Sequence, residues 1–273
     1  MIDSKQHEEL RQIYNPEGSQ LRELQLRILE ILKVVDEICR RNNIKYWLAS
    51  GTLLGAIRHG GFIPWDDDVD IEILRKDRKR FVAACNRELP LNLHVQSHKT
   101  EPNYYLNILK VRDDSSDIGE KLHLGKKGDF EPDYKYRGCF VDIFCVEPCV
   151  PSLLHFSNRV LFRILCLRFA NKGSVTLCHF LWVIMELLNG IFRKIGFFFA
   201  DNKVLYQGYS SCFDSNFRYS KKYINSVKEV SFEGVDFYAP VDSDGYLCDM
   251  YGDYMELPPD KLRIGNHSEM LES

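Results

Sequence analysis

The first strong pattern along the chain is an amphipathic stretch near its beginning. Apolar side chains recur at intervals of three and four positions from Leu21 to Ile38. That spacing places them on one face of an α-helix. The sequence therefore predicts a helix over residues 19–42, preceded by a polar segment at 1–18.

Shorter segments of alternating type follow this helix. Residues 44–49 are rich in β-forming side chains, and residues 69–74 alternate apolar and acidic positions, as in a strand with two different faces. Between them, residues 53–60 favour one or two helical turns, and 76–89 a longer helix. Further strands are predicted at 93–98, 104–113 and 139–148, with a polar loop over 114–138. This order indicates a mixed α/β or α+β sheet flanked by helices.

Residues 151–200 differ from the rest because they are apolar with scattered cations. The stretch from 175 to 200 approaches the length of a membrane span, but polar residues such as Glu186 and Arg193 interrupt it. Three interpretations stay open: two helices packed in the core, a helix lying in a membrane interface, or a true span.

These patterns divide the chain into four parts. After the polar segment 1–18 comes a core domain over 19–150 and then an apolar helical insert over 151–204. The mixed, polar remainder, 205–273, is expected to complete the core domain and to end in an ordered loop system. The division predicts one domain interrupted by a hairpin-like insert.

Composition narrows the class of protein. The chain has 273 residues, 45% of them hydrophobic, and a formal net charge of −3, so no basic field suggests nucleic acid as a partner. Nine cysteines form no C-x-x-C pair, and the N-terminal residues are too polar for a signal peptide. We expect reduced cysteines and a cytoplasmic protein, with peripheral contact at the inner face of a membrane through 151–200 as one option.

The most unusual local feature is a crowd of carboxylates before the predicted strand 69–74. Five acidic side chains fall within seven positions: Asp66, Asp67, Asp68, Asp70 and Glu72. Asp68 and Asp70 are two residues apart on a predicted strand, so they share a face at roughly 6.6 Å. Like charges repel, and paired carboxylates are the oxygen ligands that a hard cation such as Mg²⁺ prefers. The pair predicts a metal site.

Other residues extend or limit this interpretation. Asp142, alone among apolar neighbours, supplies a third carboxylate if its strand lies beside the first. Gly51 and Thr52, at a strand-to-helix turn, offer backbone N–H groups and a hydroxyl to phosphate. Taken alone, Asp66 and Asp67 also fit a solvated acidic loop, and Glu72 fits a salt bridge better than a metal ligand. The sequence contains no P-loop, EF-hand or serine-type triad.

One long motif carries a family resemblance. The run "GTLLGAIRHGGFIPWDDDVDI" closely resembles the signature of the LicD family of phosphorylcholine transferases, to which fukutin and its relatives are related. The resemblance continues in "LKVRD", "FVDIF" and "YGDYMELPP", and it covers about 20–150 and 230–267. It implies a nucleotidyltransferase-like fold, a small mixed sheet with helices around it.

The resemblance also implies roles for individual residues. Asp68, Asp70 and Asp142 match the catalytic and metal-binding carboxylates, with Mg²⁺ or Mn²⁺ as the expected cofactor. Seven further residues match substrate-binding positions: Gly51, Thr52, Arg58, His59, Lys110, Arg112 and His267. Arg58 and Lys110 are expected to stabilise charge on the leaving phosphate oxygens.

The function implied is transfer of a phospho-alcohol, foremost phosphocholine from CDP-choline or another CDP-alcohol, to a hydroxyl of a cell-surface glycan, with release of CMP. Two alternatives stay open: transfer of a nucleotide unit from a nucleoside triphosphate, and a non-catalytic membrane-associated scaffold. A choline group needs an aromatic pocket. Composition offers Trp65, Tyr104, Tyr105, Tyr251 and Tyr254 without choosing among them.

Overall fold

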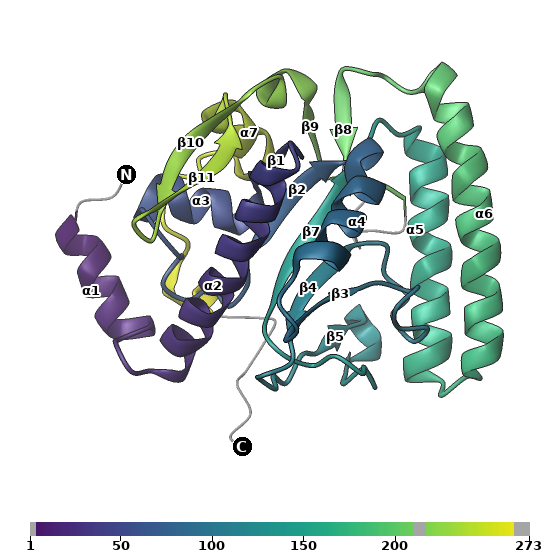
Figure 1. The fold of residues 1–273 in the computed structure, drawn as a ribbon, viewed down its shortest axis with the longest axis horizontal. Helices are drawn as coiled ribbons and strands as arrows, with labels where there is room; N and C mark the ends of the chain where they lie inside the picture. The colour runs from purple at the N-terminus through teal and green to yellow at the C-terminus, as the bar shows by residue number, and fades with distance from the viewer. Residues whose placement is uncertain (1–3, 210–216, 265–273) are drawn as a thin grey trace.

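A computed structural model describes residues 4–209 and 217–264, and Figure 1 shows their arrangement around a central sheet. The helices are α1 Ser4–Tyr14, α2 Gln20–Arg41, α3 Ser50–His59, α4 Arg78–Glu88, α5 Pro151–Leu165, α6 Val175–Phe199 and α7 Ser243–Tyr251. The main-sheet strands are β1 Tyr46–Leu48, β2 Asp70–Leu74, β3 Leu93–Gln96, β4 Leu109–Asp113 and β7 Phe140–Val146. The expected mixed α/β class is confirmed.

The main sheet has the strand order β1-β2-β7-β4-β3. Strands β2 and β7 run parallel, while the other neighbours are antiparallel. The register pairs Asp70 with Asp142, and Asp142 with Lys110. Since directly opposed residues point to the same side of a sheet, this row of polar side chains shares one face.

The opposite face of the sheet is apolar and buried. Ile71 lies opposite Ile143 in the parallel pair, and Val111 lies opposite both Val95 and Val141. Helices α2 and α4 cover this face, as Figure 1 shows. Helix α2 spans most of the predicted 19–42, and the Ser19 hydroxyl accepts a hydrogen bond from the N–H of Arg22 at its start. The amphipathic pattern of the sequence thus fixes which face of the sheet is left for polar side chains.

The C-terminal part contributes structure beyond the loops that the sequence predicts. Strands β10 Val227–Phe232 and β11 Val235–Pro240 form an antiparallel hairpin, and α7 follows it. Strand β11 packs beside β1, where the Tyr46 and Tyr238 rings lie 5.5 Å apart. This part therefore contacts α3 and the β1 edge of the sheet.

Two predicted segments are corrected. The strand expected over 104–113 begins only at Leu109, because Tyr104 and Tyr105 are buried in a second hydrophobic cluster instead of pairing in the sheet. The expected loop 114–138 contains two very short strands, β5 Leu122–His123 and β6 Asp129–Phe130. Two further short strands, β8 Val204–Tyr206 and β9 Arg218–Ser220, pair with each other.

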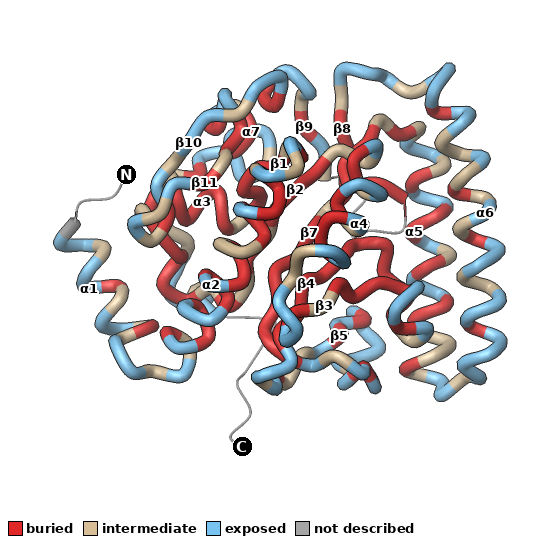
Figure 2. The backbone as a smooth tube through the Cα atoms, viewed as in Figure 1, coloured by how far each residue is buried: buried red, intermediate tan, exposed pale blue. Residues whose placement is uncertain are grey.

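The apolar insert forms two antiparallel helices, α5 and α6, at one side of the molecule (Figure 1). A π-helical turn, Cys166–Ala170, follows α5. The inner sides of both helices are buried, whereas the outer side of α6 is exposed along its length (Figure 2). The two helices therefore pack against the protein on their inner side, as core helices would, but the outer side of α6 does not. Among the described helices, α6 is long and apolar enough to cross a membrane by length and composition.

Candidate active site

The register of β2, β7 and β4 brings three predicted site residues together. Asp70 and Asp142 are neighbours across the parallel pair, and Lys110 lies beside Asp142 on the next strand. The Lys110 Nζ is 2.8 Å from one carboxylate oxygen of Asp142. The condition set by the sequence, that the strand of Asp142 lie beside the strand of Asp70, is met.

The acidic segment before β2 joins this cluster. Asp68 precedes the strand, which begins at Asp70, yet burial and then repulsion from Asp68 and Asp142 raise the pKa of Asp70 well above its usual range. Burial raises the pKa of Asp66 in the same way, reinforced by Asp68. Asp67 is buried, so the interpretation of Asp66 and Asp67 as a solvated loop is wrong.

Gly51 and Thr52 lie at the predicted turn, in the first turn of helix α3. The Thr52 hydroxyl accepts a hydrogen bond of 2.8 Å from the N–H of Asp70, so the start of α3 holds the start of β2. A Cβ atom at Gly51 would lie 2.9 Å from the Asp66 carboxylate. A larger residue at this position would push the end of the Asp66 side chain away, because real Cβ atoms do not approach oxygen so closely. Ser50, just before, has a positive φ of 47°.

The donor chemistry of the cluster fits Mg²⁺ or Mn²⁺. Asp66, Asp68, Asp70 and Asp142 are hard oxygen donors whose charges Lys110 alone offsets only in part. Within residues 4–209 and 217–264, no three His, Cys, Asp or Glu side chains already converge on one point as a closed metal cage would require. The carboxylates therefore suit a divalent ion by their charge and ligand type, and they would have to move closer together to bind it.

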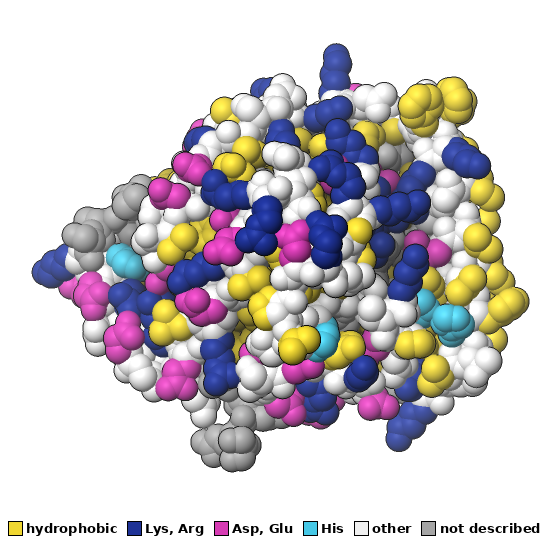
Figure 3. All heavy atoms as spheres, in the orientation of Figure 1, with side chains coloured by type: hydrophobic (Ala, Val, Ile, Leu, Met, Phe, Trp, Pro, Cys, Tyr) yellow, Lys and Arg dark blue, Asp and Glu magenta, His cyan; other side chains and the backbone are white. Residues whose placement is uncertain are grey.

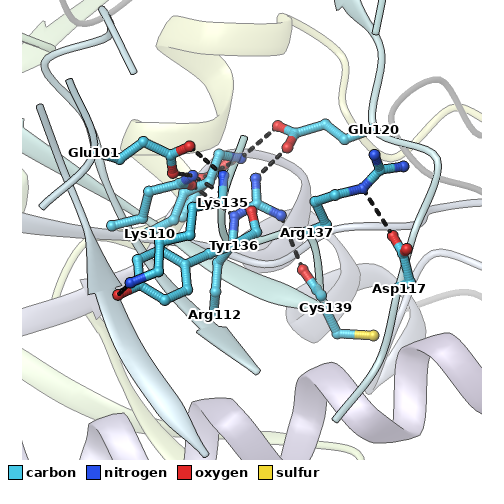
Figure 4. Close-up of polar contacts among 12 residues, drawn as sticks. Glu101, Lys110, Arg112, Asp117, Glu120, Lys135, Tyr136, Arg137 and Cys139 are labelled. Carbon is cyan, nitrogen blue, oxygen red and sulfur yellow. Dashed lines mark hydrogen bonds and ion pairs between the residues drawn. The ribbon is translucent and has the colours of Figure 1, made fainter. Parts of the chain in front are cut away.

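Lys110 and Arg112 form a buried network rather than a free basic pair (Figure 4). Lys110 contacts Glu120 at 3.2 Å as well as Asp142, and its ammonium lies 3.3 Å from the centre of the Phe140 ring. Arg112, which is fully buried, pairs with Glu120 and donates to the carbonyl of Gly138 at 2.9 Å. Lys110 orients Asp142, and Arg112 holds the segment that carries Glu120.

Arg58 and His59 lie at the other end of α3. Arg58 donates to the carbonyls of Tyr254 at 2.8 Å and Glu256 at 3.1 Å, so its guanidinium is occupied by the C-terminal segment. Burial lowers its pKa to about 10, helped by Arg263. Burial and Arg58 lower the pKa of His59 to about 3, so its ring is neutral at physiological pH.

Neither member of this pair faces the carboxylates as an open cationic group. The His59 Nδ1 lies 3.2 Å from that of His7, and its ring meets Trp65 edge-on. Arg58 still feels the Asp66 charge, which raises its pKa slightly against the other effects. His267, the last predicted substrate contact, lies outside the described residues.

Glu72 has a different role from either sequence-based option. It is fully buried and accepts hydrogen bonds from Trp47 Nε1 at 2.8 Å and the Tyr219 hydroxyl at 2.6 Å. Gln207 Nε2 lies 3.4 Å from its other oxygen. The expected salt bridge is wrong: neutral donors hold this carboxylate, although burial still raises its pKa. Glu72 thus joins β2 to β1 and β9 underneath the cluster.

The aromatic candidates separate by position. Tyr104 and Tyr105 are fully buried away from solvent, and Trp65 packs against His59. Tyr251, at the end of α7, is 42% exposed, and after burial the charge of Asp70 is the largest cause that raises its pKa. Tyr254 donates a hydrogen bond to Asp244. Tyr251 is therefore the aromatic ring from this set that both borders the carboxylates and reaches solvent.

Some site residues escaped the sequence reasoning. Glu120 lies in the segment expected to be a polar loop, and only the structure brings it to Lys110 and Arg112. Asp66 was visible as part of the acidic run, but nothing in its spacing distinguished it from a surface residue. The small Gly51 near an acidic segment was the available signal, since a close approach of chain to chain needs glycine.

Fold and site together define a mixed α/β protein with a carboxylate centre on the polar face of its sheet. The family model "LicD/FKTN/FKRP, nucleotidyltransferase domain" matches residues 43–117. The chain is 31% identical over 274 aligned positions to the lipopolysaccharide cholinephosphotransferase LicD of Haemophilus influenzae, covering 90% of this chain and 96% of that protein. The chain therefore belongs to the LicD family, which confirms the resemblance seen in its motifs.

More distant relatives share only part of the chain. The ribitol 5-phosphate transferase FKRP of Homo sapiens is 46% identical over 48 residues, 18% of this chain and 10% of that protein. The ribitol-5-phosphate transferase FKTN of Mus musculus is 32% identical over 139 residues, 45% of this chain and 30% of that protein. This chain thus matches less than a third of either protein's length.

Proposed function

We propose that this protein transfers a phospho-alcohol from a CDP-alcohol to a hydroxyl of a cell-surface glycan, with Mg²⁺ or Mn²⁺ as cofactor. CDP-choline is the first donor to test, because the relative matched along nearly its whole length is named a cholinephosphotransferase. The observation that carries the proposal is the pairing of Asp70 with Asp142 beside the acidic segment 66–68, within a chain of this family.

In the proposed reaction the acceptor hydroxyl attacks the phosphorus that bears the alcohol. A new P–O bond to the glycan forms, the bond to the CMP oxygen breaks, and the hydroxyl proton goes to a base. A bound divalent ion would neutralise charge on the phosphate oxygens and the carboxylates. We assign Asp142 as this base, and two observations support the assignment: Lys110 contacts its carboxylate, and burial raises its pKa.

Other residues supply position and surroundings. Thr52 holds the N–H of Asp70 and so fixes the start of β2. The open ring of Tyr251 beside the carboxylates is the aromatic surface offered to the cationic alcohol of the donor. In phosphoryl transfer, such positioning and charge neutralisation account for most of the catalysis.

A second candidate is nucleotidyl transfer, which the description of the matching family model favours. In that reaction the nucleotide unit moves and pyrophosphate leaves. The third possibility, a non-catalytic scaffold, is disfavoured because a protein without chemistry has no need to keep four mutually repelling carboxylates together.

The test is a product assay on the purified full chain. CDP-choline, CDP-ethanolamine, CDP-glycerol and CDP-ribitol are each incubated with Mg²⁺ or Mn²⁺ and a glycan acceptor, and CMP is measured. The proposal expects CMP from one donor, and none from D68A/D70A. The matched control Asp117→Asn changes an exposed carboxylate and should keep full activity.

Two results would contradict the proposal. One is release of pyrophosphate from CTP with no CMP from any CDP-alcohol, which supports nucleotidyl transfer. The other is CMP release that the D68A/D70A variant retains. If no CMP is released, calorimetry measures whether CDP-choline binds in the presence of metal. Binding indicates that the acceptor was wrong, and no binding indicates an inactive site.

A further inference from the structure

The side of α6 that faces the core domain carries polar groups, although the buried residues of the helix also include Cys178 and Met185. The polar groups recur at intervals of three and four positions along the helix: His179, Trp182, Glu186, Asn189 and Arg193. Such spacing places them on one side of the helix, directed at the core domain. A helix in a soluble protein normally directs its apolar side inward, and α6 departs from this by directing polar groups at the core domain while a row of apolar side chains stays exposed.

Specific contacts hold this polar face along the whole helix. The Trp182 Nε1 donates to the carbonyl of Tyr105 at 2.6 Å, and the side chain of Asn107 donates to Glu186 at 3.1 Å. Two turns further on, Arg193 Nε lies 3.0 Å from Glu147.

His179 adds a contact near the start of the helix, where its ring lies 2.8 Å from the Nε2 of His98. A helix tied to the core domain at four levels cannot leave it to cross a bilayer, because each donor or acceptor would lose its partner in hydrocarbon.

The opposite side of α6 is apolar and exposed. Steps of about 100° per residue place Ile184, Ile191 and Phe198 on the side away from Glu186. Leu187 is 68% exposed and Phe198 is 75% exposed. Figure 3 shows hydrophobic side chains along the edge of the molecule over α6. Exposed large apolar residues occur here in a continuous row, which marks an interaction surface.

The charges beside this row have one sign. Arg159, Arg163, Lys172 and Lys194 are exposed on the two helices and their connection. Glu186 is the single acidic residue of 151–200, and it is occupied by Asn107 and Asn189 on the inner face. Residues 151–200 contain 6 Lys and Arg against that one Glu, a formal net charge of +5, whereas the whole chain has a net charge of −3.

A groove between the two helices has the same combination of chemistry. It has a volume of about 240 Å³ and is lined by apolar side chains such as Phe156, Ile184 and Leu188, with Arg163 as its one charged residue. Apolar surface with a cation at its edge complements a lipid whose acyl chain lies below a negative headgroup.

We propose that the outer face of α5 and α6 docks flat on the surface of an anionic phospholipid bilayer. Charge separates this occupant from a second copy of the chain. In a two-fold symmetric contact the same surface meets itself, so Arg163 and Lys194 would face like charges. An anionic bilayer complements both features, because its acyl chains accept the apolar row and its headgroups attract the cations.

The experiment is vesicle flotation of the full chain. Vesicles of phosphatidylcholine alone are compared with vesicles that contain 30% phosphatidylglycerol. The proposal expects the wild type to float with the anionic vesicles and at least tenfold less with the neutral ones. L187S/I191S should lose binding at least tenfold. The matched control Leu91→Ser removes a fully exposed leucine elsewhere and should bind as the wild type does.

A second variant tests the contribution of the cations and leaves the apolar row unchanged. R163Q/K194Q removes two cations from the hairpin, and each cation near an anionic surface changes affinity about fivefold. Binding to the anionic vesicles should therefore fall at least tenfold. Circular dichroism checks that each variant keeps the wild-type helix content.

Three outcomes would overturn the proposal. Wild type that binds neither kind of vesicle would do so, as would L187S/I191S that floats like wild type. The third is a concentration-dependent dimer in sedimentation velocity that L187S/I191S dissociates while vesicle binding is absent, which would assign the face to a second copy. These results do not depend on turnover, so they stand apart from the test of the proposed reaction.

Discussion

The polar face of the sheet and the outer face of α6 depart from the usual distribution of side chains in opposite ways. On the sheet, charged groups such as Asp142 and Lys110 are buried. On α6, leucine and phenylalanine side chains are exposed. Each departure costs stability in the isolated protein, and each is understandable where another molecule binds. The comparison separates two surfaces of different chemistry, one that we propose for a cation and phosphate and one that we propose for lipid.

The two regions also differ in how they are held. The charged groups of the sheet hold one another, since Lys110 joins Asp142 to Glu120. The exposed residues of α6 rest on a polar inner face that bonds to the core domain. Removing the shared cation Lys110 should therefore affect fold and chemistry together, whereas changing the outer side of α6 should leave both intact.

The largest effect is expected for Asp142→Asn. This change removes the proposed base and one proposed ligand, so turnover should fall about 10²–10³-fold, the range found for a key electrostatic group. Lys110 keeps Glu120 as a partner, so the fold should survive. CMP release measures it. Glu72→Gln, on the same face of the neighbouring strand but held by neutral donors, should retain activity within about tenfold. Equal losses in both variants would remove the distinction between them.

Next in size is the effect of Lys110→Met on stability. The change leaves Asp142 and Glu120 as buried carboxylates without their shared cation, and breaking a buried ion pair costs about 3–5 kcal/mol. Urea unfolding measures it, with Lys121→Met, an exposed lysine, as the control. A loss below about 1 kcal/mol would mean that the network is not a structural unit.

A smaller effect is expected from acidification. Burial lowers the pKa of His98 to about 4. Between pH 6.5 and 4 the unfolded chain binds a proton that the folded chain does not, so stability falls as the pH drops through this window. The contribution of this one group is about 2 kcal/mol.

The urea midpoint of wild type and His98→Gln, measured from pH 7 to pH 4.5, checks this expectation. The variant should show a shallower pH dependence because its amide does not titrate. Parallel profiles for the two proteins would remove His98 as the cause. His59 has a pKa lowered in the same direction and contributes a background common to both.

The smallest effect is expected on the outer face of α6. Leu187→Ala should change the free energy of unfolding in solution by less than about 0.5 kcal/mol, because the side chain is exposed. Met185→Ala, two positions away on the buried side, should cost about 2–3 kcal/mol by leaving a cavity. Urea titration of the pair compares the two sides of one helix. Similar losses would show that the outer face is packed in solution.

The sequence predicted those features that depend on local periodicity. The helix α2 followed from its apolar spacing, and the position of Asp70 on a strand followed from alternation. That β7 lies beside β2 is a contact between segments about 70 residues apart, which no local pattern reports, so Asp142 remained conditional until the register was known.

The features that escaped prediction share a physical reason. Strand β10 does not alternate strictly between apolar and polar positions, and the described segment with Glu120 contains only two-residue strands. The reverse polarity of α6 was present in the spacing from His179 to Arg193. It was hidden because the overall apolar content of 175–200 is compatible with core, interface and span alike.

The hydrogen bonds that Arg58 donates to the carbonyls of Tyr254 and Glu256 bear on how the protein folds during synthesis. A ribosome releases residues in order, so α3 emerges almost 200 residues before the segment that satisfies its buried guanidinium. Until then the nascent chain contains the acidic segment and α3 without the C-terminal residues that pack against them. These contacts form only when β11 packs beside β1 and the C-terminal segment has been synthesised. Co-translational folding of this enzyme would thus end at its active site, and a chaperone that shields α3 would have the longest time in which to act.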